Sequence, residues 1–268
     1  MIRKAYVEQR KWLYPLVYGL FIVVNLLPLY TEKPYSPQAT QDVILNLLMV
    51  AVAPYAAYAP LFHLATLLVI SLVLWKPGRM GRLVAGYMGV NYLVIGLAQS
   101  MGQTQEYGFV IHIGALVTMI LLGGVWLAVA ARDDMRPAFR RLAPPEYGLL
   151  ALALLAYWSP YVVSSGVIQP DFNPLLLVTS PDYGLTFCFT TPVFLMGVIL
   201  FYPRVYRFAY RITAFSGLLY GLFNLTHWFS PETRWMGFLH LPLLILSVYA
   251  LLLPRIGGMA RIRSEPWN

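Results

Sequence analysis

Four histidines are the side chains in this sequence best suited to chemistry: His63, His112, His227 and His240. Neutral imidazole can bind haem iron or a transition metal, and it can hydrogen bond to a quinone head group. Counted along predicted helices at about 1.5 Å per residue, all four lie within about 12 Å of the outer membrane interface. The sequence therefore predicts a ligand pocket near that face, with His112 and His240 as a symmetric pair.

Other polar side chains extend this predicted pocket. Tyr220, Asn224 and His227 follow Ser216 at helical spacing, which places the four residues on one face of a helix. Polar side chains in lipid need partners, so we expect this face to point into the protein. The secondary candidates, which lie on two further predicted helices, are Asn91, Gln99, Asp182, Thr186 and Thr190.

Each of these side chains also has a plainer interpretation, as a hydrogen-bonding group that joins neighbouring helices. A metal site is weakly indicated, because no carboxylate lies at the same depth and no HxxxH or HExxH spacing occurs. The sequence contains no GxSxG motif, Walker sequence or acidic pair, so we predict no catalytic residue. Redox or isomerase activity through His and Tyr stays open.

The composition identifies the elements that must position these residues. Apolar residues make up 59% of the 268 residues, only 11% are charged, and the mean hydropathy is +0.64. Soluble domains are about 45–50% apolar and about 25% charged. These values exclude a soluble globular domain and a disordered chain, and the single cysteine, Cys188, excludes a disulfide framework. The sequence therefore predicts an all-α integral membrane protein.

A helix needs about 20 apolar residues to cross a bilayer, and backbone in lipid must satisfy its own hydrogen bonds. On this basis we predict eight transmembrane helices. They are Trp12–Tyr30, Tyr55–Trp75, Arg82–Ser100, Gly108–Ala131, Tyr147–Ser165, Tyr183–Tyr202, Phe208–Phe229 and Met236–Leu253.

Two shorter apolar stretches, Val43–Ala53 and Phe172–Ser180, are each followed by a proline. Proline lacks a backbone N–H and disfavours helix before it, so we predict interfacial or re-entrant segments. For the first stretch, one long tilted helix from Val43 to Trp75 is an equally good interpretation.

Charge predicts the orientation. If the N-terminus is cytoplasmic, only Lys33 and Arg234 of the 19 basic residues fall outside, as the positive-inside rule requires. We therefore expect a plasma-membrane protein with both termini in the cytoplasm. The net charge of +8 is explained by this orientation, and no nucleic-acid partner is expected. No Asp, Glu, Lys or Arg falls at mid-membrane depth, which counts against an ion-coupled pump.

The chain aligns with itself at an offset of 128 residues. Lys76 then meets Arg204, Gly89 meets Gly217, and His112 meets His240. This pattern predicts two parallel four-helix repeats, 1–131 and 147–268, joined by a basic cytoplasmic linker, 132–146.

Three functions fit these features. The leading prediction is a membrane subunit or binding protein that holds a small hydrophobic or redox ligand between the repeats. Quinone, another lipid-like molecule and haem are the candidate ligands. The alternatives are a facilitative transporter of a small, weakly polar or cationic solute, and a structural anchor for a membrane or soluble partner. Beyond such subunits, the lipid bilayer is the only partner expected.

The layout of two four-helix units, each with a long first outer loop, resembles tandem EXPERA-type sterol-binding bundles. The membrane acidic residues typical of that family are absent here. In span count and outer-leaflet polarity the layout is also similar to the quinol-site anchors of the polysulfide reductase class. Neither resemblance assigns a residue, because fold analogy does not give function.

Overall fold

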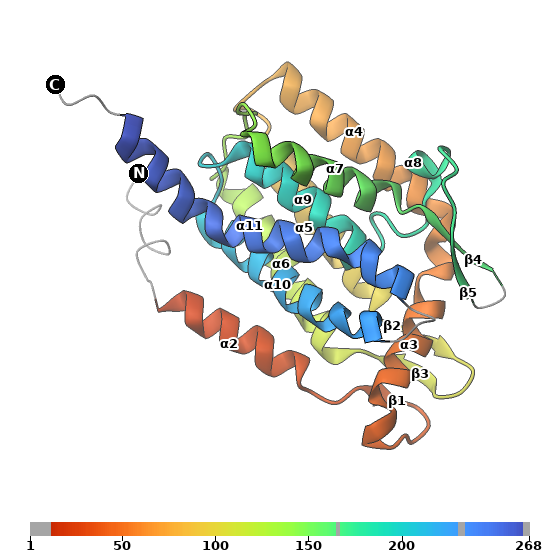
Figure 1. The fold of residues 1–268 in the computed structure, drawn as a ribbon. Coiled ribbons are helices and arrows are strands. Elements are labelled where there is room, and N and C mark those ends of the chain that lie inside the picture. Colours follow the sequence, from red (N-terminus) through yellow and green to blue (C-terminus); the bar gives the residue numbers. More distant parts are fainter. Residues whose placement is uncertain (1–11, 165–166, 230–233, 265–268) are drawn as a thin grey trace.

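The computed structural model describes residues 12–164, 167–229 and 234–264, and helices dominate it (Figure 1). The α-helices are α2 (Leu13–Asn25), α3 (Thr40–Ala51), α4 (Ala59–Trp75), α5 (Gly81–Gln99), α6 (Ile113–Arg132), α7 (Pro144–Trp158), α8 (Leu176–Thr179), α9 (Phe187–Phe201), α10 (Arg207–Phe223) and α11 (Arg234–Ser264). Three 3₁₀ segments accompany them: η1 (Pro37–Ala39), η2 (Ala53–Tyr58) and η3 (Asn224–Phe229).

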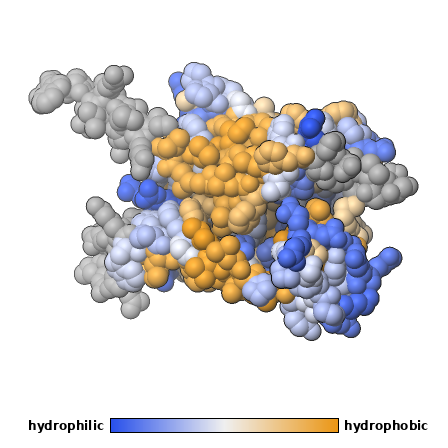
Figure 2. Space-filling model, turned by 60° about the horizontal axis from the view of Figure 1, so that its bottom comes forward, coloured by the Kyte–Doolittle hydropathy of each residue, from blue (hydrophilic) through white to orange (hydrophobic). Residues whose placement is uncertain are grey.

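The protein is an all-α membrane protein. Within the described residues, four helical segments are long and apolar enough to cross a bilayer: Pro37–Trp75, Gly81–Gln99, Ile113–Arg132 and Arg234–Pro254. Helices α2 and α9 are shorter but apolar. Large apolar side chains are exposed on several of the other helices, including Leu61 on α4 at 62%. Figure 2 shows an apolar surface across the middle of another face, with hydrophilic residues toward its two sides.

Several predicted spans are longer than the helices of the structure, as for Trp12–Tyr30, where α2 stops at Asn25, and Tyr183–Tyr202, where α9 starts at Phe187. Two further predicted spans include a strand of a β-hairpin. Gly108–Ile111 forms strand β3, which pairs with β1 (Tyr30–Thr31) and β2 (Met101–Thr104), so α6 begins only at Ile113. Likewise β4 (Tyr161–Ser164) pairs with β5 (Val167–Pro170), and α7 ends at Trp158. Left-handed backbone explains both changes: Gly108 has φ +68° at the hairpin turn, and Ser159 has φ 46° directly before Pro160.

The first of the two short apolar stretches is part of a longer helical segment. Helices α3 and α4 follow one another through η2, so Pro37–Trp75 is helical over 39 residues apart from Val52. This agrees with the interpretation as one long helix, with a 3₁₀ bend at Pro54. The second stretch contains only the single turn α8, which packs against α4 and α7.

Glycine allows the tightest helix pair, α5 with α6. A Cβ at Gly89 would lie 2.8 Å from Leu127 Cγ, and one at Gly123 would lie 2.9 Å from the Gly89 carbonyl oxygen. Close approach through small residues is typical of helix pairs in membranes. The Trp126 indole on α6 then donates to Thr213 Oγ1 on α10 at 2.9 Å, which joins this pair to the second half of the chain.

The loop between α6 and α7 is held against α7 and α11. Its Arg140 pairs with Glu146, which is 1% exposed, and the Tyr249 hydroxyl donates to the same carboxylate at 2.7 Å. A buried carboxylate needs such partners, because removing it from water is costly. The loop is therefore an ordered part of the structure.

Candidate functional site

The described contacts do not bring the predicted site residues together in one pocket. His63 on α4 is fully buried between the rings of Tyr157 and Tyr183, at centroid distances of 4.6 and 4.8 Å. Its Nε2 donates to the Ser180 carbonyl oxygen at 3.2 Å, while Nδ1 has no partner among the described residues. His63 thus joins α4 to the segment around α8.

Two of the other histidines do come together. The rings of His227 in η3 and His240 on α11 stack at 5.5 Å, and Nδ1 of His240 donates to the Met236 carbonyl at 2.6 Å. Close by in sequence to His227, Asn224 donates to the Cys188 sulfur at 3.2 Å. These contacts link η3 to α9 and α11, as expected for polar side chains that join neighbouring helices.

The sequence predicts His112 within a transmembrane helix, but the structure places it directly before one. It is the N-cap of α6, and its Nδ1 accepts a hydrogen bond from the backbone N–H of Ala115 at 3.2 Å. Such a cap satisfies one of the free donors at the start of a helix. No described contact joins His112 to His240. Tyr220 has a bridging role of its own, because its hydroxyl donates to Asn25 Oδ1 at 2.7 Å.

The secondary candidates hold the turn that leads into α9. Asn91 donates to the Gly184 carbonyl at 2.8 Å, and the Gly184 N–H donates to Thr190 at 2.8 Å. Gln99 accepts from the N–H of Phe187 at 2.8 Å, and Thr186 donates to the Asp182 carbonyl at 3.1 Å. These contacts position the start of α9.

Asp182 itself lies in the turn before α9. Burial raises the pKa of Asp182 to about 6, although a hydrogen bond from Tyr161 acts in the opposite direction. This carboxyl therefore changes charge in the mildly acidic range.

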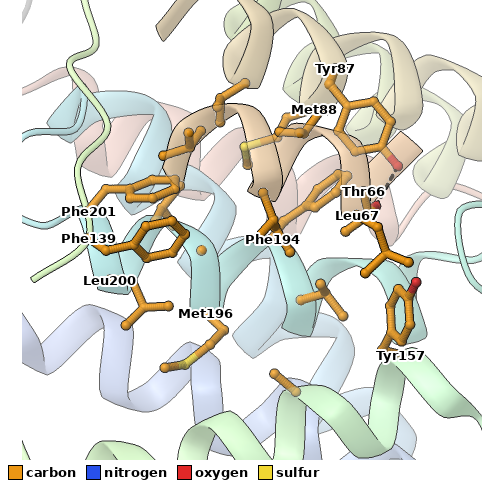
Figure 3. Close-up of a pocket in the computed structure, with 18 of the residues that line it drawn as sticks. Thr66, Leu67, Tyr87, Met88, Phe139, Tyr157, Phe194, Met196, Leu200 and Phe201 are labelled. Carbon is orange, nitrogen blue, oxygen red and sulfur yellow. Dashed lines mark hydrogen bonds between the residues drawn. The ribbon is translucent and has the colours of Figure 1, made fainter. Parts of the chain in front are cut away.

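A cleft among α4, α5, α7 and α9 is the feature most suited to a ligand. It has a volume of about 170 Å³ and is lined by Leu, Val, Ile, Met and Phe side chains, with a few others (Figure 3). Thr66, Tyr87 and Tyr157 lie at one end of the cleft, and Phe139 and Phe201 lie at the other. We call these the hydroxyl end and the phenylalanine end.

The hydroxyl groups of the cleft already have protein partners. Thr66 Oγ1 lies 2.8 Å from the Tyr87 hydroxyl and 2.7 Å from the Tyr183 hydroxyl. The Tyr87 hydroxyl donates to the Phe62 carbonyl at 3.1 Å, and the Tyr157 hydroxyl donates to the His63 carbonyl at 3.1 Å. Since these groups are satisfied, the cleft presents hydrocarbon to an occupant.

The cleft opens toward the apolar surface of the protein. Leu67 and Ile70 of α4 and Leu154 of α7 line it, and they are also 45%, 40% and 54% exposed. Gly197 of α9 contributes to this space, because a Cβ there would meet only one atom, Phe201 Cε2, at 4.0 Å. A hydrocarbon chain could enter from the bilayer without crossing a polar surface.

Reasoning from polar side chains missed this cleft, because most of its lining consists of residues expected in any membrane helix. Gly197 within the bulky sequence Phe194–Phe201 is the one signal that could have indicated a hollow. Among the described residues, no three His, Cys, Asp or Glu side chains are arranged to hold a metal ion. Comparison with protein-family models, curated proteins and solved structures finds no match to this chain.

Proposed function

We propose that this protein is an integral membrane protein that binds the hydrocarbon chain of a lipid-like molecule in the cleft among α4, α5, α7 and α9. The observation that carries the proposal is the lining of the cleft, whose only hydroxyls, on Thr66, Tyr87 and Tyr157, are bonded within the protein. A polar solute would find no hydrogen-bonding partner there and would lose its hydration.

The size of the cleft supports the same occupant. An apolar cavity of about 150 Å³ in another protein stays free of water and accepts a ligand as large as benzene. The cleft, at about 170 Å³, is slightly larger and is open along one side. It therefore suits a segment of acyl or isoprenoid chain, whose remainder continues into the bilayer or along the protein.

The proposed ligand site is this cleft, whereas the sequence predicted a pocket lined by the histidines. A quinone ring in the cleft would need a free donor for its carbonyl oxygen, whereas an isoprenoid tail would not. Phospholipids and isoprenoid lipids, quinones included, share the chain that the cleft accommodates, and analysis of the bound lipid distinguishes them.

The proposal includes eight membrane crossings, by α2, α3–α4, α5, α6, α7, α9, α10 and α11, in a plasma membrane. Two observations support it: basic residues gather in the loops after α4, α6 and α9, and the positive-inside rule places such loops in the cytoplasm. Both termini are then cytoplasmic. Equivalent pairing of α5 with α6 and of α10 with α11, each through glycine, favours the two-repeat arrangement.

The test is to fill the cleft. Gly197→Phe places a ring into open space within it, and Gly124→Phe is the matched control, because Gly124 is an exposed glycine on α6 with no atom near its Cβ position. Each variant is purified in mild detergent, and the retained lipid is measured by mass spectrometry.

We expect the wild type and Gly124→Phe to retain one class of lipid in near-stoichiometric amount, and Gly197→Phe to lose it. A thermal unfolding curve shows that the variant is folded, and the smaller Gly197→Leu serves if it is not. Equal retention by a folded Gly197→Phe or Gly197→Leu would refute the proposal.

A further inference from the structure

Exposed basic residues closely follow three residues that line the cleft, two of them at its phenylalanine end. Val73, Phe139 and Phe201 line the cleft, and each is followed within three residues by an exposed cation. These cations are Lys76, Arg141 and Arg204.

Backbone hydrogen bonds bring the three loops together. The N–H of Gly78, in the turn after α4, donates to the Pro137 carbonyl at 2.6 Å. The N–H of Arg136 donates to the Arg204 carbonyl at 3.2 Å, beyond the end of α9. Residues 133–143 therefore form the centre of a cationic rim, which we define by Lys76, Arg141 and Arg204.

Three other basic residues nearby have carboxylate partners. Arg136 pairs with Asp133 at 2.8 Å, Arg82 lies 3.9 Å from the same carboxylate, and Arg140 pairs with Glu146. Among the described ion pairs, none includes Lys76, Arg141 or Arg204. Lys76 instead lies over the Trp75 ring, with Nζ 4.2 Å from the ring centroid.

Lipid chains of one kind make the same hydrocarbon contacts in the cleft whatever head group they carry, because the lining of the cleft is as apolar as the bilayer core. Selection among lipids must then come from the head group. Basic pockets at the cytoplasmic side of membrane helices favour anionic head groups.

We infer that the cleft selects an anionic, phosphate-bearing lipid, whose chain lies in the cleft and whose phosphate is bound by the rim. This inference rests on the proposed function and adds the head-group class and the orientation of the ligand.

The experiment uses the full chain, delipidated in detergent and titrated with phosphatidylglycerol or with phosphatidylcholine of the same acyl chains. Bound lipid is counted by native mass spectrometry. The test variant carries Lys76→Gln and Arg141→Gln. The matched control carries Arg132→Gln and Arg207→Gln, which remove two charges from α6 and α10, helices that contribute no residue to the cleft.

We expect phosphatidylglycerol to bind the wild type more tightly than phosphatidylcholine. Each rim cation contributes about fivefold, so the test variant should lose roughly 25-fold in phosphatidylglycerol affinity with little change for phosphatidylcholine. The control should keep the wild-type preference. Lys76→Arg with Arg141→Lys should also keep it, which covers the case in which the neutral variant fails to fold.

Equal binding of the two lipids by the wild type, or an equal loss in the control, would overturn the inference. Displacement of the lipid by millimolar inorganic phosphate would also overturn it, since the rim would then be a site for free anions. If the wild type binds the two lipids equally but Gly197→Phe binds neither of them, the chain site stands and only the head-group assignment fails. If Gly197→Phe binds both normally, the proposed function itself fails.

Discussion

Substitution of Gly89 by alanine tests the packing between α5 and α6. The new Cβ would lie 2.8 Å from Leu127 Cγ, 2.9 Å from the Leu127 backbone nitrogen and 3.0 Å from the Gly123 carbonyl oxygen. Two of these atoms belong to the α6 backbone, so the strain can be relieved only if the helices move apart. Overpacking of this kind costs about 1 to 3 kcal/mol, whereas alanine improves helix propensity by up to about 1 kcal/mol.

The expected result is a net destabilisation of about 1 to 2 kcal/mol, and so a fall of about 2 to 8 °C in the unfolding midpoint. Cys188 provides the assay: it is the single cysteine and is buried, so a thiol-reactive fluorescent dye reports unfolding in detergent. Gly124→Ala is the control, because nothing lies within 4 Å of its Cβ position. A midpoint for Gly89→Ala at or above that of the wild type would show that the helices are not packed as described.

Two further predictions concern carboxyl groups. The first uses the same dye assay, and the second follows unfolding by tryptophan fluorescence, because thiols react too slowly with the dye near pH 4. Glu146→Ala leaves Arg140 without its buried partner and should lower stability by about 3 kcal/mol, with a smaller loss for Glu146→Gln; an unchanged midpoint would contradict the ion-pair geometry. The pKa of Asp182 is near 6 in the folded protein, above its ordinary value, so the folded state favours the protonated carboxyl. The free energy of unfolding is therefore highest below about pH 4, and this contribution is lost as the pH rises through 6. The wild type should therefore lose about 1 to 2 kcal/mol relative to Asp182→Asn between pH 4 and 7, after allowance for solvent screening, and parallel pH profiles would argue against a raised pKa of this carboxyl.

Hydropathy was sufficient to predict the helical membrane architecture. The long apolar runs Tyr55–Trp75 and Arg82–Ser100 both correspond largely to helices, because a bilayer leaves the backbone few alternatives. Span ends were less predictable. Gly108–Ile111 and Tyr161–Ser164 are as apolar as the helices that they adjoin, and only the turn residues beside them indicate strands. Hairpin pairing depends on a second segment, which periodicity within one run does not reveal.

The candidate site was harder to predict than the fold. Histidine side chains attract attention in a membrane sequence, yet His112 caps a helix, and His63 and His240 donate to backbone carbonyls. The cleft, in contrast, depends on how far apart α4 and α9 lie, and no residue type records that separation. Only the small residue Gly197 marks it in the sequence.

The cleft lies between helices from before and after the linker at 132–146, so whatever fills it helps to solvate both parts of the chain. An empty space of about 170 Å³ would cost about 4 kcal/mol, at about 24 cal/mol for each cubic ångström of void. That cost is a substantial fraction of the stability of an ordinary domain. The choice of detergent during extraction therefore becomes a structural variable, because stripping agents would remove a component that holds the two parts together.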